Sequence, residues 1–221
     1  MKSGKSLQGI SLRILLLVFL AQPALGIEFG VLGGTTFSRF SSPDLSWRFG
    51  LGYSAGLFAD LRLNRWLRLQ PQLLFTAVGS SAVIPIRYSG TALDVDIAKT
   101  VQAVELPVIL RLAPAVRGKI RPSLQVGACL AANIHGRERL EFNNQISSQN
   151  IDDEINKKIR AGFLAGIGAD FSLGRVPLFL SCLWRGGFPW LARNYLRQDI
   201  KSSGLMISVG VGLWRLGKGI G

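Results

Sequence analysis

The chemistry that this chain could support begins with its single histidine, His135. In a hydrolase a histidine takes the proton of a serine nucleophile, so a serine must lie within hydrogen-bond reach of the ring. His135 is followed by Gly136 and Arg137, and no serine stands close behind it in the sequence. A solvated histidine, at the point where a strand enters a loop, is therefore the simpler interpretation. An enzyme that modifies lipids through His135 is the alternative.

Neither a metal site nor a phosphate site is predicted. Asp152, Asp153 and Glu154 lie further along the same segment as His135, but they lack the glycine turn and the terminal glutamate of a calcium loop. The glycines of residues 162–168 lack the lysine and the following helix of a phosphate-binding loop, and are better explained as small residues of a narrow barrel interior. We therefore expect no catalytic residue, no cofactor and no metal, and a protein that is not an enzyme.

The elements that carry these residues place apolar side chains at every second position. From Phe49 to Leu61 the odd-numbered residues are all apolar, whereas six of the seven alternating residues from Gly50 to Arg62 are small or polar. A helix would repeat every three or four residues, so the pattern predicts a β-strand with one apolar and one largely polar face. The same alternation recurs in residues 67–77, 103–112, 123–130, 160–171 and 205–214.

Two further strands, at about residues 27–40 and 177–187, bring the count to eight. An even number lets an up-and-down barrel close, so we expect an all-β fold, an eight-stranded antiparallel up-and-down transmembrane β-barrel. The short connections are 63–65, 113–119 and 173–176, and the mostly longer ones are 41–46, 81–96, 135–156 and 189–203. Short periplasmic turns and long external loops are typical of outer-membrane barrels. A soluble β-sandwich, which shares the period of two, is the alternative.

Four tryptophans fall at the ends of predicted strands. Trp47 and Trp190 lie at long-loop ends, and Trp66 and Trp214 lie at short-turn ends. Tryptophan collects at both interfaces of a membrane, so these positions predict two aromatic belts. By strict alternation, however, Trp214 falls on the polar face of its strand together with Gly212.

The polar faces of the predicted strands carry charged residues that decide how the barrel interior is built. They are Asp60, Arg62, Arg68, Glu105, Arg111, Arg121, Arg160, Asp170 and Arg185. On a lipid-facing surface each would cost about 2–4 kcal/mol near the midplane, so all are expected inside. An eight-stranded barrel has an interior that side chains can fill. We therefore expect each of the three acids to pair with arginines in a filled lumen, with Glu105 more important for stability than a loop acid such as Asp153.

The two cysteines fall on different faces of their predicted strands. Cys129 lies on the polar face of the fifth strand, and Cys182 lies on the apolar face of the seventh. A disulfide needs both side chains to point at each other across a short distance. No disulfide is therefore expected.

The first 26 residues have the layout of a secretory signal. Lys2, Lys5 and Arg13 precede an apolar run at 14–20, and Ala24-Leu25-Gly26 forms a small-x-small cleavage site. The run is shorter than the roughly 20 residues of a helical membrane span. We expect residues 1–26 to be cleaved and residues 27–221 to form the barrel domain in the bacterial outer membrane.

The net charge points to an anionic partner. The signal contributes three positive charges of a net +13, which leaves 13 − 3 = +10 for the mature chain. The arginines are dispersed rather than gathered in one stripe, and an exported chain does not meet nucleic acid. We therefore expect membrane lipids, including anionic lipopolysaccharide, as the counter-charge, and no nucleic-acid partner.

Four stretches carry a resemblance to a known family. They are VLGGTTFS at 31–38, GYSAGLF at 52–58, LQPQLLF at 69–75 and VELPVILR at 104–111. In these stretches, and over essentially all of the mature chain, the sequence resembles the PorT-like outer-membrane β-barrel proteins of Bacteroidota-type bacteria. Members usually have Glu where Gln72 stands and end near the last strand, whereas residues 215–221 follow it here. Some relatives take part in a protein-secretion system, but nothing in these residues transfers that role. A surface protein or a secretion-system component is the kind of partner that the resemblance suggests.

Together these observations predict an integral outer-membrane barrel without enzymatic activity. We expect a monomer with a filled lumen and a structural or surface-interaction role through the external loops 81–96 and 135–156. The alternatives are a lipid-modifying enzyme that uses His135, and a narrow channel.

Overall fold

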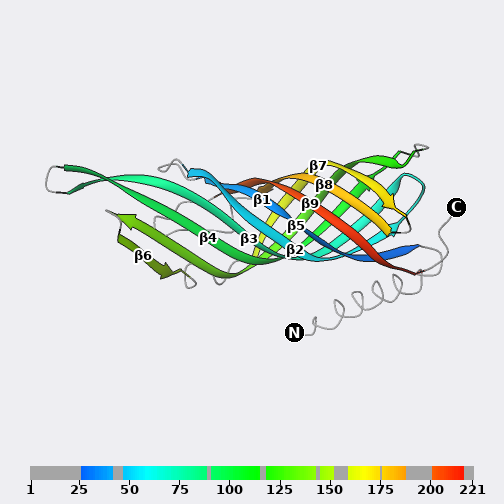
Figure 1. Ribbon diagram of the computed structural model, residues 1–221, viewed down its shortest axis with the longest axis horizontal. Coiled ribbons are helices and arrows are strands. Elements are labelled where there is room, and N and C mark those ends of the chain that lie inside the picture. The colour runs from blue at the N-terminus through cyan, green and yellow to red at the C-terminus, as the bar shows by residue number, and fades with distance from the viewer. Residues whose placement is uncertain are drawn as a thin grey trace, which may run out of the picture.

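The computed structural model describes residues 26–41, 47–88, 91–114, 118–142, 145–151, 159–174, 176–187 and 201–216. Within these ranges the regular structure is β-strand, and paired strands are antiparallel (Figure 1). In chain order the strands are β1 (Ile27–Ser41), β2 (Trp47–Arg62), β3 (Leu67–Tyr88), β4 (Thr91–Leu112), β5 (Ile120–Phe142), β6 (Gln145–Asn150), β7 (Ile159–Leu173), β8 (Val176–Gly187) and β9 (Lys201–Leu216). No helix among the described residues is both long and apolar enough to cross a membrane.

Eight of these strands close into a ring. The order is β1-β2-β3-β4-β5-β7-β8-β9, and β1 pairs with both β2 and β9. β6 lies outside the ring, where it pairs with the outer part of β5. The sequence-based expectation of an eight-stranded, antiparallel, up-and-down barrel is confirmed, with β6 as an added strand in a segment expected to be loop.

The short turns follow from local sequence. Between β2 and β3, the side-chain oxygen of Asn64 accepts hydrogen bonds from the backbone N–H groups of Trp66 and Leu67, each at 2.8 Å. Between β7 and β8, Gly174 adopts a positive φ of 63°, a conformation that glycine reaches without steric cost. These turns hold consecutive strands in antiparallel register at one end of the ring, here called the turn end.

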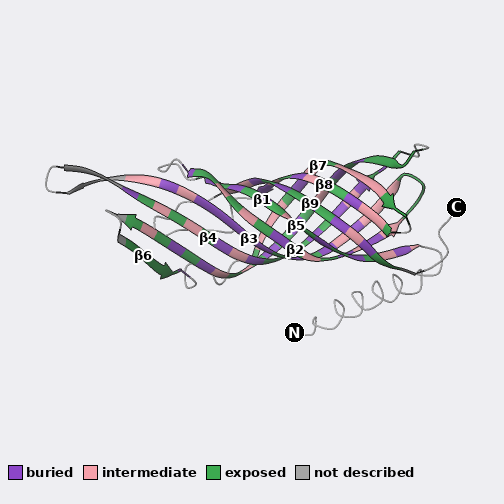
Figure 2. Ribbon diagram, viewed as in Figure 1, coloured by how far each residue is buried: buried purple, intermediate pink, exposed green. Residues whose placement is uncertain are grey.

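Side chains on the ring strands alternate between an exposed apolar face and a buried face, as the bands of Figure 2 show. Leu51 and Leu124 are 69% and 62% exposed, whereas Glu105 and Arg111 are each 1% exposed. A water-soluble protein would place these residue types the other way round. The outer surface therefore suits lipid, as the parity of the sequence predicted.

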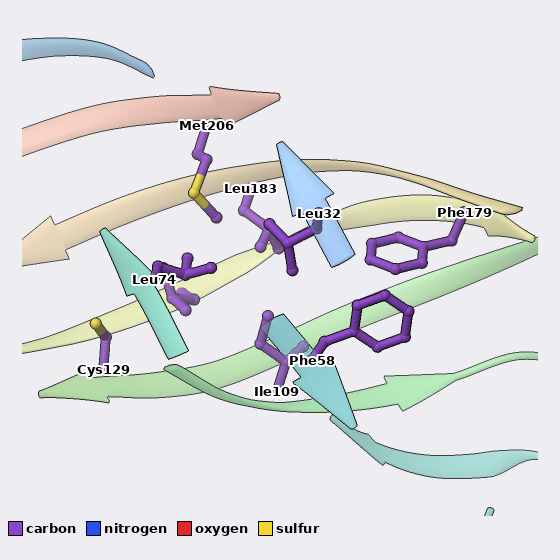
Figure 3. Close-up of a cluster of buried hydrophobic side chains, with 9 residues drawn as sticks. Leu32, Phe58, Leu74, Ile109, Cys129, Phe179, Leu183 and Met206 are labelled. Carbon is purple, nitrogen blue, oxygen red and sulfur yellow. The ribbon is translucent and has the colours of Figure 1, made fainter. Parts of the chain in front are cut away.

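Apolar side chains pack together across the middle of the ring (Figure 3). The set consists of Leu32, Phe58, Leu74, Ile109, Cys129, Leu164, Phe179, Leu183 and Met206. The rings of Phe58 and Phe179 meet edge to face, with centroids 4.9 Å apart and planes at 87°. Gly30 and Gly210 make room for this pair, since a Cβ on either would run into one of the two rings.

The strands are longer than the sequence indicated at the other end, here called the loop end. Residues 81–96 were expected to form a loop, but β3 continues to Tyr88 and β4 begins at Thr91. In the same way, much of 135–156 forms a hairpin of β5 with β6, and both hairpins project from the same end of the barrel (Figure 1). Beyond the lipid-facing part of the barrel, the outer face of a strand need not be apolar, so apolar and polar residues need not alternate. The sequence signal fades there although the strand pairing continues.

Irregular pairing corrects the expected position of Trp47 and explains the exposed position of Trp214. The pairing of β2 with β3 shifts by one residue between Phe49 and Tyr53, and Trp47 is only 6% exposed rather than part of an outer belt. A bulge between β1 and β9 aligns Trp214 with outward-facing Phe29, so Trp214 is exposed despite its expected parity. Bulges re-aim side chains in this way. Trp66 is exposed as predicted, and Trp190 lies outside the described residues.

The space made by Gly210 can be tested with an alanine substitution. Gly210→Ala should lower the free energy of unfolding by about 1–3 kcal/mol, because its methyl group overlaps the Phe179 ring. Gly33→Ala is the matched control, since its Cβ would meet only the Ser54 carbonyl oxygen at an ordinary 3.9 Å. Urea unfolding in lipid vesicles, followed by tryptophan fluorescence, measures both. Equal losses for the two variants would contradict the proposed packing.

Candidate functional site

The buried charges inside the ring form two groups. The first, here called the turn-end cluster, joins Asp60, Arg68, Arg111 and Asp170 from β2, β3, β4 and β7. Arg111 donates to Asp60 through Nη1 at 3.0 Å and to Asp170 through Nη2. The Arg68 Nη1 atom lies 3.6 Å from Asp60 and 3.2 Å from Asp170. Two arginines thus balance two carboxylates across the barrel.

Register explains why the turn-end cluster must draw acids from different strands. Arg111 is aligned with Arg68, and Arg68 is aligned with Arg62, so three neighbouring strands present arginines on one rung. Like charges at such short range repel each other unless carboxylates intervene. Asp60 comes from the next rung of β2, and Asp170 comes from β7. Arg111 also lies over the Phe179 ring, 5.1 Å from its centroid.

The second group, here called the Glu105 cluster, lies further toward the loop end. Arg185 of β8 donates to both carboxylate oxygens of Glu105, through Nη1 to Oε2 at 2.9 Å and through Nη2 to Oε1. Thr76 of β3 donates to Oε1 at 2.8 Å, and the Cys129 sulfur lies 3.8 Å from Oε2. Such bidentate contacts are among the strongest that arginine makes.

Two apolar layers alternate with these ionic groups. Phe58, Ile109 and Phe179 lie between the turn-end cluster and the Glu105 cluster. Along β4, Ile109 comes between Arg111 of the first cluster and Glu105 of the second. A second apolar set caps the interior nearer the loop end, and it consists of Phe40, Trp47, Val78, Ala82 and Val101. Phe40 and Trp47 meet edge to face, with centroids 5.6 Å apart.

Most of the predicted interior charges lie where parity placed them. Asp60, Glu105 and Asp170 each pair with at least one arginine, and Glu105 shares the inner face with Arg111, as expected. Arg121 does not follow the expectation: it is exposed, because it is only the second residue of β5 and lies at the rim of the turn end. Parity identifies a face, but it does not say how far along the barrel a residue lies.

Sequence reasoning overlooked Thr76, whose hydroxyl supports Glu105. Thr76 is fully buried on the inner face of β3. The alternation of polar residues along this strand could have placed Thr76 on the inner face. It could not have shown that the hydroxyl bonds Glu105, because that contact depends on how the strands pair. Among the glycines assigned to the interior, Gly168 allows Gln125 to approach, since a Cβ there would overlap the Gln125 amide.

His135 lies within β5 rather than in a loop. It is half-buried and aligned with Gln102, beside a bulge at which the β4–β5 register shifts. The bulge reverses the parity of the outer part of β5. No group of three or more histidine, cysteine or acidic residues suited to a metal occurs in the described ranges, and Asp152, Asp153 and Glu154 fall outside them. That His135 has no catalytic role stays a prediction.

Cys129 and Cys182 lie on opposite faces, as predicted. Cys129 is buried inside the ring, whereas Cys182 is aligned with Ile207 on the outer face and is half-buried. Both thiols are free.

The Glu105 cluster generates a stability test. Glu105→Leu should lower the free energy of unfolding by about 3–5 kcal/mol, because Arg185 is left buried without its carboxylate. Glu141→Leu is the control, since Glu141 meets Arg139 at 3.3 Å with both side chains about half exposed, and the cost should be about 0–1 kcal/mol. Adding Arg185→Met to Glu105→Leu should recover most of the loss. Unfolding midpoints in urea would decide, and a small loss for Glu105→Leu would contradict the assignment.

Several solved structures resemble this chain. Neisserial surface protein A is 16% identical, over 84% of this chain and 97% of that one, with a TM-score of 0.40. Ail, the attachment invasion locus protein of Yersinia pestis, is 14% identical over 84% and 98%, with a TM-score of 0.42. OprG from Pseudomonas aeruginosa is 10% identical over 85% and 92%, with a TM-score of 0.39.

No curated protein sequence matches the chain significantly. The family model described as outer membrane protein beta-barrel domain matches residues 20–184. Since that match covers most of the sequence, the chain belongs to the family of outer-membrane proteins with a β-barrel domain.

Proposed function

We propose that this protein is a monomeric, non-enzymatic outer-membrane barrel with a closed interior, which acts through the strands that project from its loop end. The observation that carries the proposal is the stacking of ionic and apolar layers inside the ring. The turn-end cluster, the Phe58–Phe179 pair and the Glu105 cluster follow one another along the barrel axis. An eight-stranded ring is just wide enough for such side chains.

The buried side chains argue against a wide aqueous path. Arg111 and Ile109 have almost no exposed surface, and they belong to successive layers on the inner face of β4. A water-filled pore would leave such side chains solvated, as in the much larger porin barrels. The narrow channel is therefore the less favoured alternative, and conductance measurements can distinguish the two.

The projecting sheet is a candidate surface for interaction. It comprises the loop-end parts of β3, β4 and β5 together with β6. Lys99 and Glu138 form a 3.4 Å ion pair across β4 and β5, and Gln149 of β6 donates to Glu138 at 3.2 Å. These contacts hold the sheet in order beyond the ring. Exposed residues such as Arg137 and Ile146 then provide charged and apolar contact area.

The finer assignments belong to the same proposal. Export would follow removal of residues 1–26, which lie almost wholly outside the described ranges. The net positive charge of the mature chain would favour contact with anionic lipopolysaccharide in the outer leaflet. Membership of the PorT-like group, and with it a surface or secretion-system partner, rests on the sequence resemblance alone.

A closed interior predicts electrical silence. Purified protein reconstituted into a planar bilayer should show no discrete conductance steps, because paired charges and aromatic rings occupy successive layers. A large-pore porin inserted into the same bilayers confirms that steps can be detected. Reproducible steps from this protein alone would favour the channel and contradict the closed interior.

The orientation of the projecting sheet can be tested by labelling intact cells. A membrane-impermeant maleimide should modify Ser148→Cys, because Ser148 lies exposed on β6 at the loop end. Arg65→Cys is the matched control, since Arg65 is also exposed but lies in the β2–β3 turn at the other end. Labelling of Arg65→Cys but not Ser148→Cys would invert the barrel and remove the proposed interaction surface from outside the cell.

A further inference from the structure

Arg160 differs from the other arginines inside the barrel. It lies on β7, where its residue is aligned with Ala131 of β5, and Ala131 is aligned with Glu105 of β4. Aligned residues of paired strands share a face, so Arg160 faces the interior together with Glu105. The Nε and Nη2 atoms of Arg160 are buried and donate no hydrogen bond within the part of the chain that the structure describes.

The acid next to Arg160 is already engaged. Both oxygens of Glu105 accept hydrogen bonds from Arg185, and Thr76 donates to one of them. Arg160 lies within electrostatic range of Glu105 and Arg185. Among the described residues, two guanidinium groups therefore face one carboxylate here, whereas the turn-end cluster pairs two arginines with two acids. Since arginine keeps its charge, one positive charge in this part of the described chain has no acidic partner, and its Nε and Nη2 atoms are shielded from solvent.

The unpaired donors have a defined geometry. Nε–H and Nη2–H lie on the same edge of the guanidinium group and point in nearly parallel directions. One acceptor in front of that edge can receive both hydrogen bonds. A cation is excluded by the surplus charge, and a small anion meets both requirements.

We propose that a small inorganic anion, of which chloride is the abundant example, binds inside the barrel at the Nε/Nη2 edge of Arg160 and neutralises the positive charge that Arg160 adds beside the Glu105 cluster. The anion completes the ion balance of this layer. Because the anion binds the folded barrel and not the unfolded chain, it stabilises the fold by an amount that rises with the anion concentration.

The first test measures stability against anion concentration. The temperature of half-unfolding, followed by heat-modifiable gel mobility, should rise by about 4 °C when gluconate is replaced by chloride at constant ionic strength. Arg160→Met should lose this dependence, and in gluconate it should be at least as stable as the parent. Arg121→Met is the matched control, because Arg121 has the same parity but is exposed at the rim, and it should keep the dependence.

The second test does not depend on a variant that folds. Crystals of the unaltered protein grown in sodium bromide should show an anomalous scattering peak within hydrogen-bond distance of the Arg160 guanidinium group. The proposal is overturned if chloride and gluconate give the same midpoint and no bromide peak appears. It is equally overturned if Arg160→Met keeps the full chloride dependence, or if the peak lies elsewhere.

Discussion

The closed ring of eight strands has an interior so narrow that its acidic residues meet arginines from other strands. Arg111 reaches Asp60 of β2 and Asp170 of β7, and Glu105 of β4 reaches Arg185 of β8. Each contact crosses the ring rather than following it. The ionic contacts therefore depend on closure, and closure in turn brings charges together that would be costly if left apart.

The apolar layers show the same dependence on the ring. Phe58 and Phe179 come from β2 and β8, which are not paired strands, and their edge-to-face contact exists only because the interior is narrow. Gly30 and Gly210 provide the necessary space on β1 and β9. The interior thus combines a core like that of a small soluble protein with paired charges, while the outer face carries the apolar side chains that lipid requires.

Beyond the ring, the strands respond to a different solvent. The loop-end parts of β3, β4 and β5 continue their hydrogen-bonded pairing into water, and β6 extends the sheet on one side. Ion pairs such as Lys99 with Glu138 are compatible with this setting, because neither face must be apolar. The two parts therefore differ in composition: the ring has apolar side chains on its outer face, whereas the projecting sheet has exposed charged residues such as Arg137 and Arg139.

From the sequence alone, the period of two determined the ring strands, their inward and outward faces, and the need of Asp60, Glu105 and Asp170 for arginine partners. Those features depend on the cost of a charge in lipid, which acts on each residue separately. Tertiary structure decided which arginine meets which acid. It also decided that Trp47 points inward, that Trp214 points outward, and that Arg121 is exposed. It also revealed the surplus charge at Arg160, since only paired strands show that Glu105 is already engaged. These outcomes depend on register, bulges and position along the barrel, which the alternation of residue types does not record.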